Sequence, residues 1–201
     1  MNRVIEHYNL LVEEGNDPVH DPKPLQDYMD KWDGQDFIDK LKLDKTKAVL
    51  EIGVGTGRLA VKVVPLCGLF FGIDISSKTI ERARENLVNW DNVALFCGDF
   101  AAYSFSQTFD VIYSSLTFMH IKDKQTTLNK VASLLKFDGR FVLSIDKNQE
   151  KFIDMGSRKI CVYPDNLEDT ELYIKNAGLK IIEQGVTEFA HIFVAIKYKY
   201  S

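Results

Sequence analysis

A short apolar run that leads directly into three closely spaced glycines constrains the fold of this chain most. The segment, residues 48–60, reads AVLEIGVGTGRLA, and its glycines are Gly53, Gly55 and Gly57. Glycine lets the backbone turn sharply and approach a ligand closely, while free N–H groups at the start of the following helix face that ligand. The pattern therefore predicts a strand, a ligand-binding loop and a helix in succession.

From residue 47 onward, apolar β-like runs alternate with longer amphipathic stretches, which is typical of a parallel sheet with helices on both faces. The predicted strands are Ala48–Ile52, Phe70–Asp74, Val93–Phe96, Asp110–Tyr113, Arg140–Ile145, Lys180–Gln184 and Ile192–Lys197. The predicted helices are Arg58–Pro65, Lys78–Asn89, Lys124–Leu135 and Leu167–Ala177. The stretch between the last two strands is too short for a parallel crossover, so these strands are expected to form an antiparallel hairpin.

Helix ends and the N-terminal region complete the expected organisation. Ser76 and Ser77 are candidate N-caps, and Gly139 and Gly178 follow helices where a left-handed residue is common. Residues 1–46 are polar and contain prolines, with helical patches at Val4–Glu13 and Leu25–Leu43. We expect these residues to form a helical cap on a single domain whose ligand-binding part spans residues 47–201.

The spacing of the glycine loop argues against a dinucleotide. A dinucleotide fingerprint requires a small residue three positions after Gly55, where this chain has Arg58, and the third glycine comes too early. Glu51, two residues before the first glycine, would repel a phosphate and suits a ligand with cationic groups. A small molecule that carries a sulfonium and an ammonium would fit, and an NAD-dependent oxidoreductase is disfavoured.

Carboxylates follow the next two predicted strands. Asp74 ends the second strand, where it can accept hydrogen bonds from both hydroxyls of a ribose. Asp99 follows the third strand and can accept from an exocyclic amine, with Phe100 beside it. A single Asp at a strand end is usually a turn former, but acidic groups at successive strand ends indicate one nucleoside site.

Together these segments resemble the class I S-adenosylmethionine-dependent methyltransferases over roughly residues 47–198. LEIGVGTG is similar to the first motif of that family, GIDIS to the second, GDF to the third, FDVIYSS to the fourth, and LLKFDGRFVLS to the segment leading into the fifth strand. The resemblance implies a Rossmann-like, doubly wound α/β sheet of seven strands with the last antiparallel. It also implies S-adenosylmethionine as cofactor. The cofactor-binding residues expected on this basis are Glu51, Gly53, Val54, Gly55, Gly57, Asp74, Ile75, Asp99, Phe100 and Ser114.

The methyl acceptor is expected beyond the fourth and fifth strands. His120 is a candidate general base because an unperturbed imidazole titrates near neutral pH, and its alternative is a cofactor-side or capping role. Asp146 could orient an amine or a metal, or be a solvated turn residue. The Pro-Pro aromatic signature of nucleic-acid amino methyltransferases and the Pro-Cys nucleophile of cytosine-carbon enzymes are both absent from the sequence, and no metal site is expected.

Two further segments are candidates for the pocket mouth. Tyr28 and Trp32 could close over the sulfonium by cation–π contact, as could Tyr8, or these aromatic residues and Met29 could pack the N-terminal helix onto the sheet. The polar stretch after the fifth strand contains Arg158, which with the adjacent Lys159 could meet an acidic substrate or be solvated.

Composition sets the remaining expectations. The formal net charge of −4 provides no global positive field, so nucleic acid is not expected as a partner. No apolar run spans a bilayer, no secretory signal is evident, and three widely spaced cysteines predict reduced, mostly buried thiols in a cytoplasmic monomer or homodimer. The sequence predicts a methyltransferase acting on a small molecule. The alternatives are a protein or RNA methyltransferase of the same fold and a non-catalytic S-adenosylmethionine-binding module.

Overall fold

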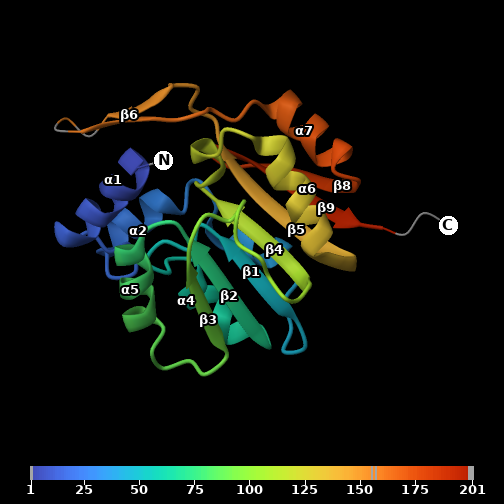
Figure 1. Cartoon of the computed structure of the whole chain (residues 1–201), viewed down its shortest axis with the longest axis horizontal. Coiled ribbons are helices and arrows are strands. Elements are labelled where there is room, and N and C mark those ends of the chain that lie inside the picture. The colour runs from blue at the N-terminus through green and yellow to red at the C-terminus, as the bar shows by residue number, and fades with distance from the viewer. Residues whose placement is uncertain (1, 155, 157, 199–201) are drawn as a thin grey trace.

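The chain forms a seven-stranded sheet in the order β3-β2-β1-β4-β5-β9-β8 (Figure 1). The computed structural model describes residues 2–154, 156 and 158–198. The sheet strands are β1 (Ala48–Ile52), β2 (Leu69–Asp74), β3 (Val93–Cys97), β4 (Phe109–Ser115), β5 (Leu135–Asp146), β8 (Leu179–Val186) and β9 (Ala190–Lys197). The five neighbouring strands β3, β2, β1, β4 and β5 pair in parallel, whereas β9 is antiparallel to both β5 and β8. This topology confirms the predicted Rossmann-like fold and the C-terminal hairpin.

Helices cover both faces of the sheet, because successive strand side chains point to opposite sides. Val49 packs with the helices α3 (Gly34–Lys40), α4 (Ala60–Val63) and α5 (Ser77–Asn86). Leu50 packs on the other face with α6 (Lys124–Leu134) and α7 (Leu167–Asn176). The order in which strands are added to the sheet reverses after β1, which pairs in parallel with β2 on one side and β4 on the other. Ligands of open α/β sheets bind at such a switch point, at the carboxyl ends of the strands.

The N-terminal region consists of α1 (Asn2–Glu13), α2 (Lys23–Met29) and α3 rather than the two predicted patches. The predicted helix over Leu25–Leu43 is broken because the Asp33 carboxylate accepts a hydrogen bond from Gly34 N at 2.7 Å and begins α3. Helix α1 lies beside α5 (Figure 1), where Asn9 Oδ1 accepts a hydrogen bond from Ser76 Oγ at 2.8 Å. The first helix is thereby fixed over the end of the sheet.

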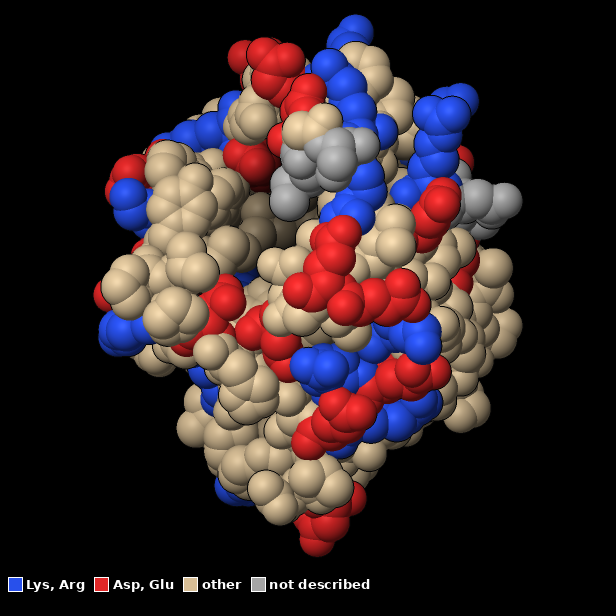
Figure 2. Space-filling view, turned by 90° about the vertical axis from the view of Figure 1, so that its left-hand side faces the viewer, with Lys and Arg blue, Asp and Glu red and all other residues tan. Residues whose placement is uncertain are grey.

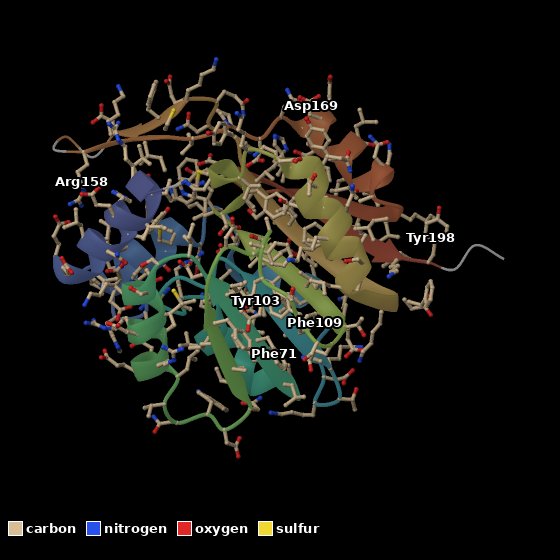
Figure 3. The ribbon with its side chains drawn as sticks, viewed as in Figure 1. Phe71, Tyr103, Phe109, Arg158, Asp169 and Tyr198 are labelled. Atoms are coloured by element: carbon tan, nitrogen blue, oxygen red, sulfur yellow. The ribbon has the colours of Figure 1, made fainter. Side chains whose placement is uncertain are left out.

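A small antiparallel hairpin, absent from the sequence prediction, follows β5. It pairs β6 (Phe152–Asp154) with β7 (Lys159–Cys161) and extends above α1 (Figure 1). Arg158, at the outer part of this hairpin in Figure 3, donates two hydrogen bonds to the Glu14 carboxylate, at 2.5 and 2.6 Å. The hairpin and the end of α1 are therefore held together by an ion pair.

Several boundary predictions are confirmed and others are wrong. Ser76 caps α5 by accepting a hydrogen bond from Thr79 N, and Gly178 ends α7 with a φ of 79°. Gly139 ends no helix, since β5 begins at Leu135. In addition, α4 begins at Ala60 and passes into the 3₁₀ turn η1 (Val64–Leu66).

The prediction that the three thiols are mostly buried is wrong. Cys67 is buried, but Cys97 and Cys161 are exposed, and all three thiols are free. Burial raises the pKa of the Cys67 thiol to about 11.

Among the described residues, no helix has the length and apolar character needed to cross a membrane.

Candidate active site

A cavity of about 1370 Å³ lies at the carboxyl ends of β1 to β4. The segments that follow these strands line it at residues 53–56, 74–75, 98–101 and 115–117, and α1 and β7 contribute residues from the opposite side. Figure 2 shows the molecule from the side on which α1 and the hairpin lie, and its surface is hollowed there. The volume exceeds the roughly 300–1,000 Å³ of typical small-molecule sites, so the cavity has room for two ligands side by side.

The glycine loop forms the floor of the cavity. Gly53, Gly55 and Gly57 have φ values of 79°, 54° and 99°, which favour glycine. A Cβ at Gly53 would lie 1.9 Å from Thr117 Oγ1, so a side chain at this position is also sterically excluded. The loop is fixed to the sheet by a 2.8 Å hydrogen bond from Gly53 N to Ile73 O.

Asp74 connects the end of β2 to this loop. Its carboxylate accepts hydrogen bonds from Gly55 N at 2.9 Å, Ser76 N at 2.9 Å and the Thr79 hydroxyl at 3.1 Å. Burial raises the pKa of Asp74, and the hydrogen bonds from the backbone oppose that rise. A carboxylate accepts about four hydrogen bonds. Room therefore remains for about one more, fewer than the two ribose hydroxyls expected from the sequence.

Glu51 is a buried carboxyl group at the end of β1. Its side chain accepts a 2.7 Å hydrogen bond from the Tyr113 hydroxyl, and the residue is 3% exposed. Burial raises the pKa of Glu51 to about 8, although the Tyr113 hydrogen bond and the charge of Arg58 act in the opposite direction. A cationic ligand group in the cavity would stabilise the ionised form of this carboxyl group.

Arg58 and Asp33 form a buried ion pair beside the loop. The Arg58 guanidinium donates to both Asp33 oxygens, and the Ser115 hydroxyl donates to one of them at 2.7 Å. This bidentate pair joins the start of α3 to the glycine loop and to the end of β4. The sequence analysis used Arg58 only as evidence against a dinucleotide and missed its partner, because Asp33 lies 25 residues earlier.

Ile75, Asp99 and Phe100, at the ends of β2 and β3, also line the cavity. The Asp99 Oδ1 atom accepts a 2.9 Å hydrogen bond from Ala101 N, and Phe100 is buried with Lys130 Nζ 5.2 Å from its ring centroid. The structure thus brings these three predicted residues to the same cavity as the glycine loop.

His120 faces the cavity from η2 (Phe118–His120), the turn after β4. Its Nε2 is hydrogen bonded to the Tyr8 hydroxyl of α1 at 2.8 Å, while its buried Nδ1 has no hydrogen-bond partner among the described residues. Burial lowers the pKa of His120 to about 4, so the imidazole is neutral at physiological pH. Burial also raises the pKa of the Tyr8 hydroxyl, which stays protonated.

Most predicted site residues line the cavity, and four do not. The residues that line it are Glu51, Gly53, Val54, Gly55, Asp74, Ile75, Asp99, Phe100 and His120. Gly57, the last glycine of the loop, is not part of the lining. Ser114 is buried, and its hydroxyl donates a hydrogen bond to Ile52 O at 2.8 Å. Tyr28 and Trp32 also lie outside the lining, whereas Tyr8 and Met29 are part of it.

Tyr28 and Trp32 pack against Phe189 instead. The ring centroids of Trp32 and Phe189 are 4.7 Å apart, and those of Tyr28 and Phe189 are 5.7 Å apart. Phe189 lies in the loop between β8 and β9, so both rings contact that loop. The packing alternative considered from the sequence therefore describes their contacts, and no sequence pattern indicated Phe189 as the partner.

Comparison with known proteins gives the family. Residues 43–189 match the family described as "Methyltransferase domain". An "uncharacterized methyltransferase" of Anoxybacillus flavithermus is 26% identical over 190 residues, which cover 86% of this chain and 88% of that protein. A malonyl-[acyl-carrier protein] O-methyltransferase of Priestia megaterium is 36% identical over 100 residues, covering 48% of this chain and only 36% of the relative.

Solved structures share the fold. A chain of the complex between the Haloferax volcanii Trm112 methyltransferase activator and a methyltransferase superposes with a TM-score of 0.78 at 18% identity, covering 96% of this chain and 98% of that one. The N-methyltransferase NodS of Bradyrhizobium japonicum, solved with S-adenosyl-L-homocysteine, gives a TM-score of 0.70 at 16% identity and covers 98% and 100%.

The cavity residues fit the methyl donor of this family. Glu51 offers a buried carboxyl group to a cation, Asp74 retains room for a hydrogen bond, and a Cβ at Gly55 would project into open space. Because the family match covers well over half of the chain, the chain belongs to the class I methyltransferases, enzymes that use S-adenosylmethionine as methyl donor.

Proposed function

We propose that this enzyme transfers the methyl group of S-adenosylmethionine to a small molecule held between the glycine loop and α1. The observation that carries the proposal is the cavity itself. Its volume is about 1370 Å³, and residues of α1 and β7 line it together with the strand ends. A concave site of this kind suits a small acceptor better than an extended macromolecule. The formal charge of −4 also argues against RNA as the acceptor.

The proposed cofactor contacts follow the order of the strands. Glu51 and the loop around Gly53 and Gly55 would hold the methionine part, with Val54 in the same loop. Asp74 would accept one ribose hydroxyl beside Ile75. Asp99 would accept from the adenine amine, with Phe100 against the ring. Bound S-adenosylmethionine supplies a methyl group on a sulfonium, whose carbon–sulfur bond electrons remain on sulfur when the methyl leaves.

The enzyme's main task in such a transfer is to align the acceptor. A nucleophile must approach the methyl carbon in line, at about 3–3.5 Å, to reach a reactive geometry. The neutral His120 imidazole would accept a proton or a hydrogen bond from the acceptor, and Tyr8 would hold the ring through Nε2. The lining residues of α1 would exclude water from the transfer.

A transfer assay tests the acceptor class. The protein is incubated with methyl-labelled S-adenosylmethionine and, separately, with the small-molecule filtrate and the macromolecular fraction of a cell extract. The proposal predicts label in small organic products and release of S-adenosylhomocysteine with the filtrate. Label in protein or RNA would support the alternative methyltransferases, and binding of the cofactor without transfer in either fraction would support the non-catalytic module.

A further inference from the structure

Lys124, the first residue of α6, has a largely buried side chain next to the turn that carries His120. Its Nζ donates hydrogen bonds to Phe118 O of η2 at 2.8 Å and to Tyr163 O, after β7, at 2.9 Å. His120 and Tyr163 line the cavity, whereas Lys124 does not. The ammonium therefore joins two segments that contribute lining residues without lining the cavity itself.

The counterion of this ammonium is Asp165, which lies shortly before α7. The Asp165 Oδ1 atom lies 2.6 Å from Lys124 Nζ, and the two side chains are 2% and 11% exposed. Burial raises the pKa of Asp165, and the charge of Lys124 opposes that rise. Gln149, after β5, donates a 2.9 Å hydrogen bond to Asp165 O. The ion pair thus connects the start of α6 to the chain before α7 and after β5.

Backbone hydrogen bonds strengthen the same junction. Tyr163 N donates to Met119 O at 2.7 Å, so both main-chain groups of Tyr163 are bonded here, its N–H to η2 and its carbonyl to Lys124. Met119 directly precedes His120 in the turn. The position of the His120 backbone therefore depends on the contacts that Lys124 and Tyr163 make with this turn.

The charge of Lys124 also acts on the His120 imidazole. Burial is the main cause that lowers the pKa of His120 to about 4, and the charges of His7 and Lys124 act in the same direction. Burial also lowers the pKa of His7 itself, and the Tyr8 hydroxyl that is bonded to His120 Nε2 stays protonated. A nearby ammonium disfavours a second positive charge, so Lys124 favours the neutral ring, which can accept a proton.

We propose that Lys124 is a positioning residue for methyl transfer, whose ammonium, paired with Asp165, fixes the turn that carries His120 against the segment after β7. This inference rests on the proposed function, because it states how the proposed base is held. A buried ion pair adds little net stability compared with apolar residues of similar size, and its best-attested use is to fix one arrangement of the elements it joins. Such fixing matters for transfer, since a misplacement of about 1 Å can cost roughly 100-fold in rate.

Three variants test the proposal. The double variant Lys124→Met with Asp165→Asn removes both charges, because removing one partner alone would leave an uncompensated charge in the interior. Lys124→Arg keeps a cation that can donate to both carbonyls. Lys147→Met is the matched control, because Lys147 Nζ also donates to two main-chain oxygens, those of Thr187 and Glu188, and lies outside the cavity lining.

NMR of the histidine rings, on the whole protein with saturating S-adenosylhomocysteine, gives a readout that needs no methyl acceptor. The His120 signal is identified by its loss in His120→Ala and is titrated downwards from pH 8. We expect the pKa of His120 to rise in the double variant by about one unit, the order of shift that a nearby like charge produces. Lys124→Arg and Lys147→Met should leave it at the native value of about 4.

Steady-state kinetics with an acceptor from the filtrate assay give the second readout. The double variant should lower kcat by about 10- to 100-fold, because the ring is no longer held in place. The KM for S-adenosylmethionine should stay close to the native value, since Lys124 does not line the cavity. Lys124→Arg should recover most of the lost kcat, and Lys147→Met should lose none.

The proposal is overturned if the double variant matches Lys147→Met in both the His120 pKa and kcat. Calorimetric titration with S-adenosylhomocysteine separates this failure from that of the proposed function. If S-adenosylhomocysteine binds and the two variants behave alike, only the role of Lys124 is wrong. If S-adenosylhomocysteine does not bind the native protein, the proposed function and the role of Lys124 fall together.

Discussion

The Tyr8 hydroxyl and His120 Nε2 are joined by a 2.8 Å hydrogen bond between α1 and the turn after β4. The Nδ1 atom of the same ring is buried and has no hydrogen-bond partner among the described residues, and His120 is part of the cavity lining. The N-terminal helix thus both closes the cavity and orients the histidine at the proposed acceptor side.

His120→Ala is expected to lower kcat much more than it lowers cofactor affinity. A general base contributes roughly 10²- to 10⁴-fold, so a loss of at least about 100-fold is expected. Tyr8→Phe should give a smaller loss, because the ring stays in place but loses its fixed orientation. The measurement is steady-state release of S-adenosylhomocysteine with an acceptor found in the filtrate assay. His20→Ala, at a histidine outside the cavity lining that binds Asn86, is the control. Unchanged kcat in His120→Ala would assign His120 to structure.

Asp74→Asn is expected to weaken S-adenosylhomocysteine binding by about 10- to 100-fold, since a hydrogen bond to a charged group contributes roughly 1.5–3 kcal/mol. The carboxylate also holds Gly55 N, so the loop becomes less well ordered in the variant. Isothermal calorimetry measures the change. Asp110→Asn is the matched control, because Asp110 also accepts from a backbone N–H, that of Ala48, at the opposite end of the sheet. Equal affinity of Asp74→Asn and the native protein would refute the ribose assignment.

Glu51 predicts a pH dependence of folding stability. Its pKa is about 8 in the folded protein and 4.5 for an unperturbed glutamate, so the folded state binds more protons than the unfolded state between these limits. The contribution of Glu51 therefore lowers the free energy of unfolding as pH rises from about 4.5 to 8, by several kcal/mol in total. Glu51→Gln should remove this dependence and be the more stable form near pH 8. Urea unfolding across this pH range tests it, and parallel curves for the two proteins would contradict the assignment.

The architecture of the sheet could be predicted because its determinants are local. Apolar runs, the glycine loop and the short link between the last two strands determine the strands, and the topology then gathers Glu51, Asp74 and Asp99 at neighbouring strand ends. The family resemblance supplied the chemistry at those positions.

The rest of the site depends on partners that are distant in the sequence. Asp33, which caps α3, binds Arg58 of the glycine loop, and Trp32 packs against Phe189 outside the cavity lining. Likewise, the hairpin of β6 and β7 crosses above α1, where Arg158 binds Glu14. No periodicity or spacing within one segment could have indicated these pairs.

The ion pair of Arg158 and Glu14 predicts slow release of the cofactor product. Arg158→Ala removes the link between the hairpin and α1, so S-adenosylhomocysteine should dissociate severalfold faster in stopped-flow measurements. The charge-exchanged double variant, Glu14→Arg with Arg158→Glu, should restore the slow rate. Lys175→Ala removes an exposed pair with Glu171 on α7 and is the control. Identical dissociation rates in the native protein and Arg158→Ala would show that the ion pair does not restrain α1 and the hairpin of β6 and β7 over the cavity.

The central claim is that the cavity at the ends of β1 to β4 binds S-adenosylmethionine. Calorimetric titration of the purified protein with S-adenosylmethionine, S-adenosylhomocysteine and NADH tests it most directly. We expect micromolar binding of the first two ligands with a stoichiometry of one per chain. We expect no binding of NADH, because Glu51 would repel a phosphate and Arg58 stands where a dinucleotide site requires a small residue. Absence of S-adenosylhomocysteine binding at millimolar ligand would contradict the account.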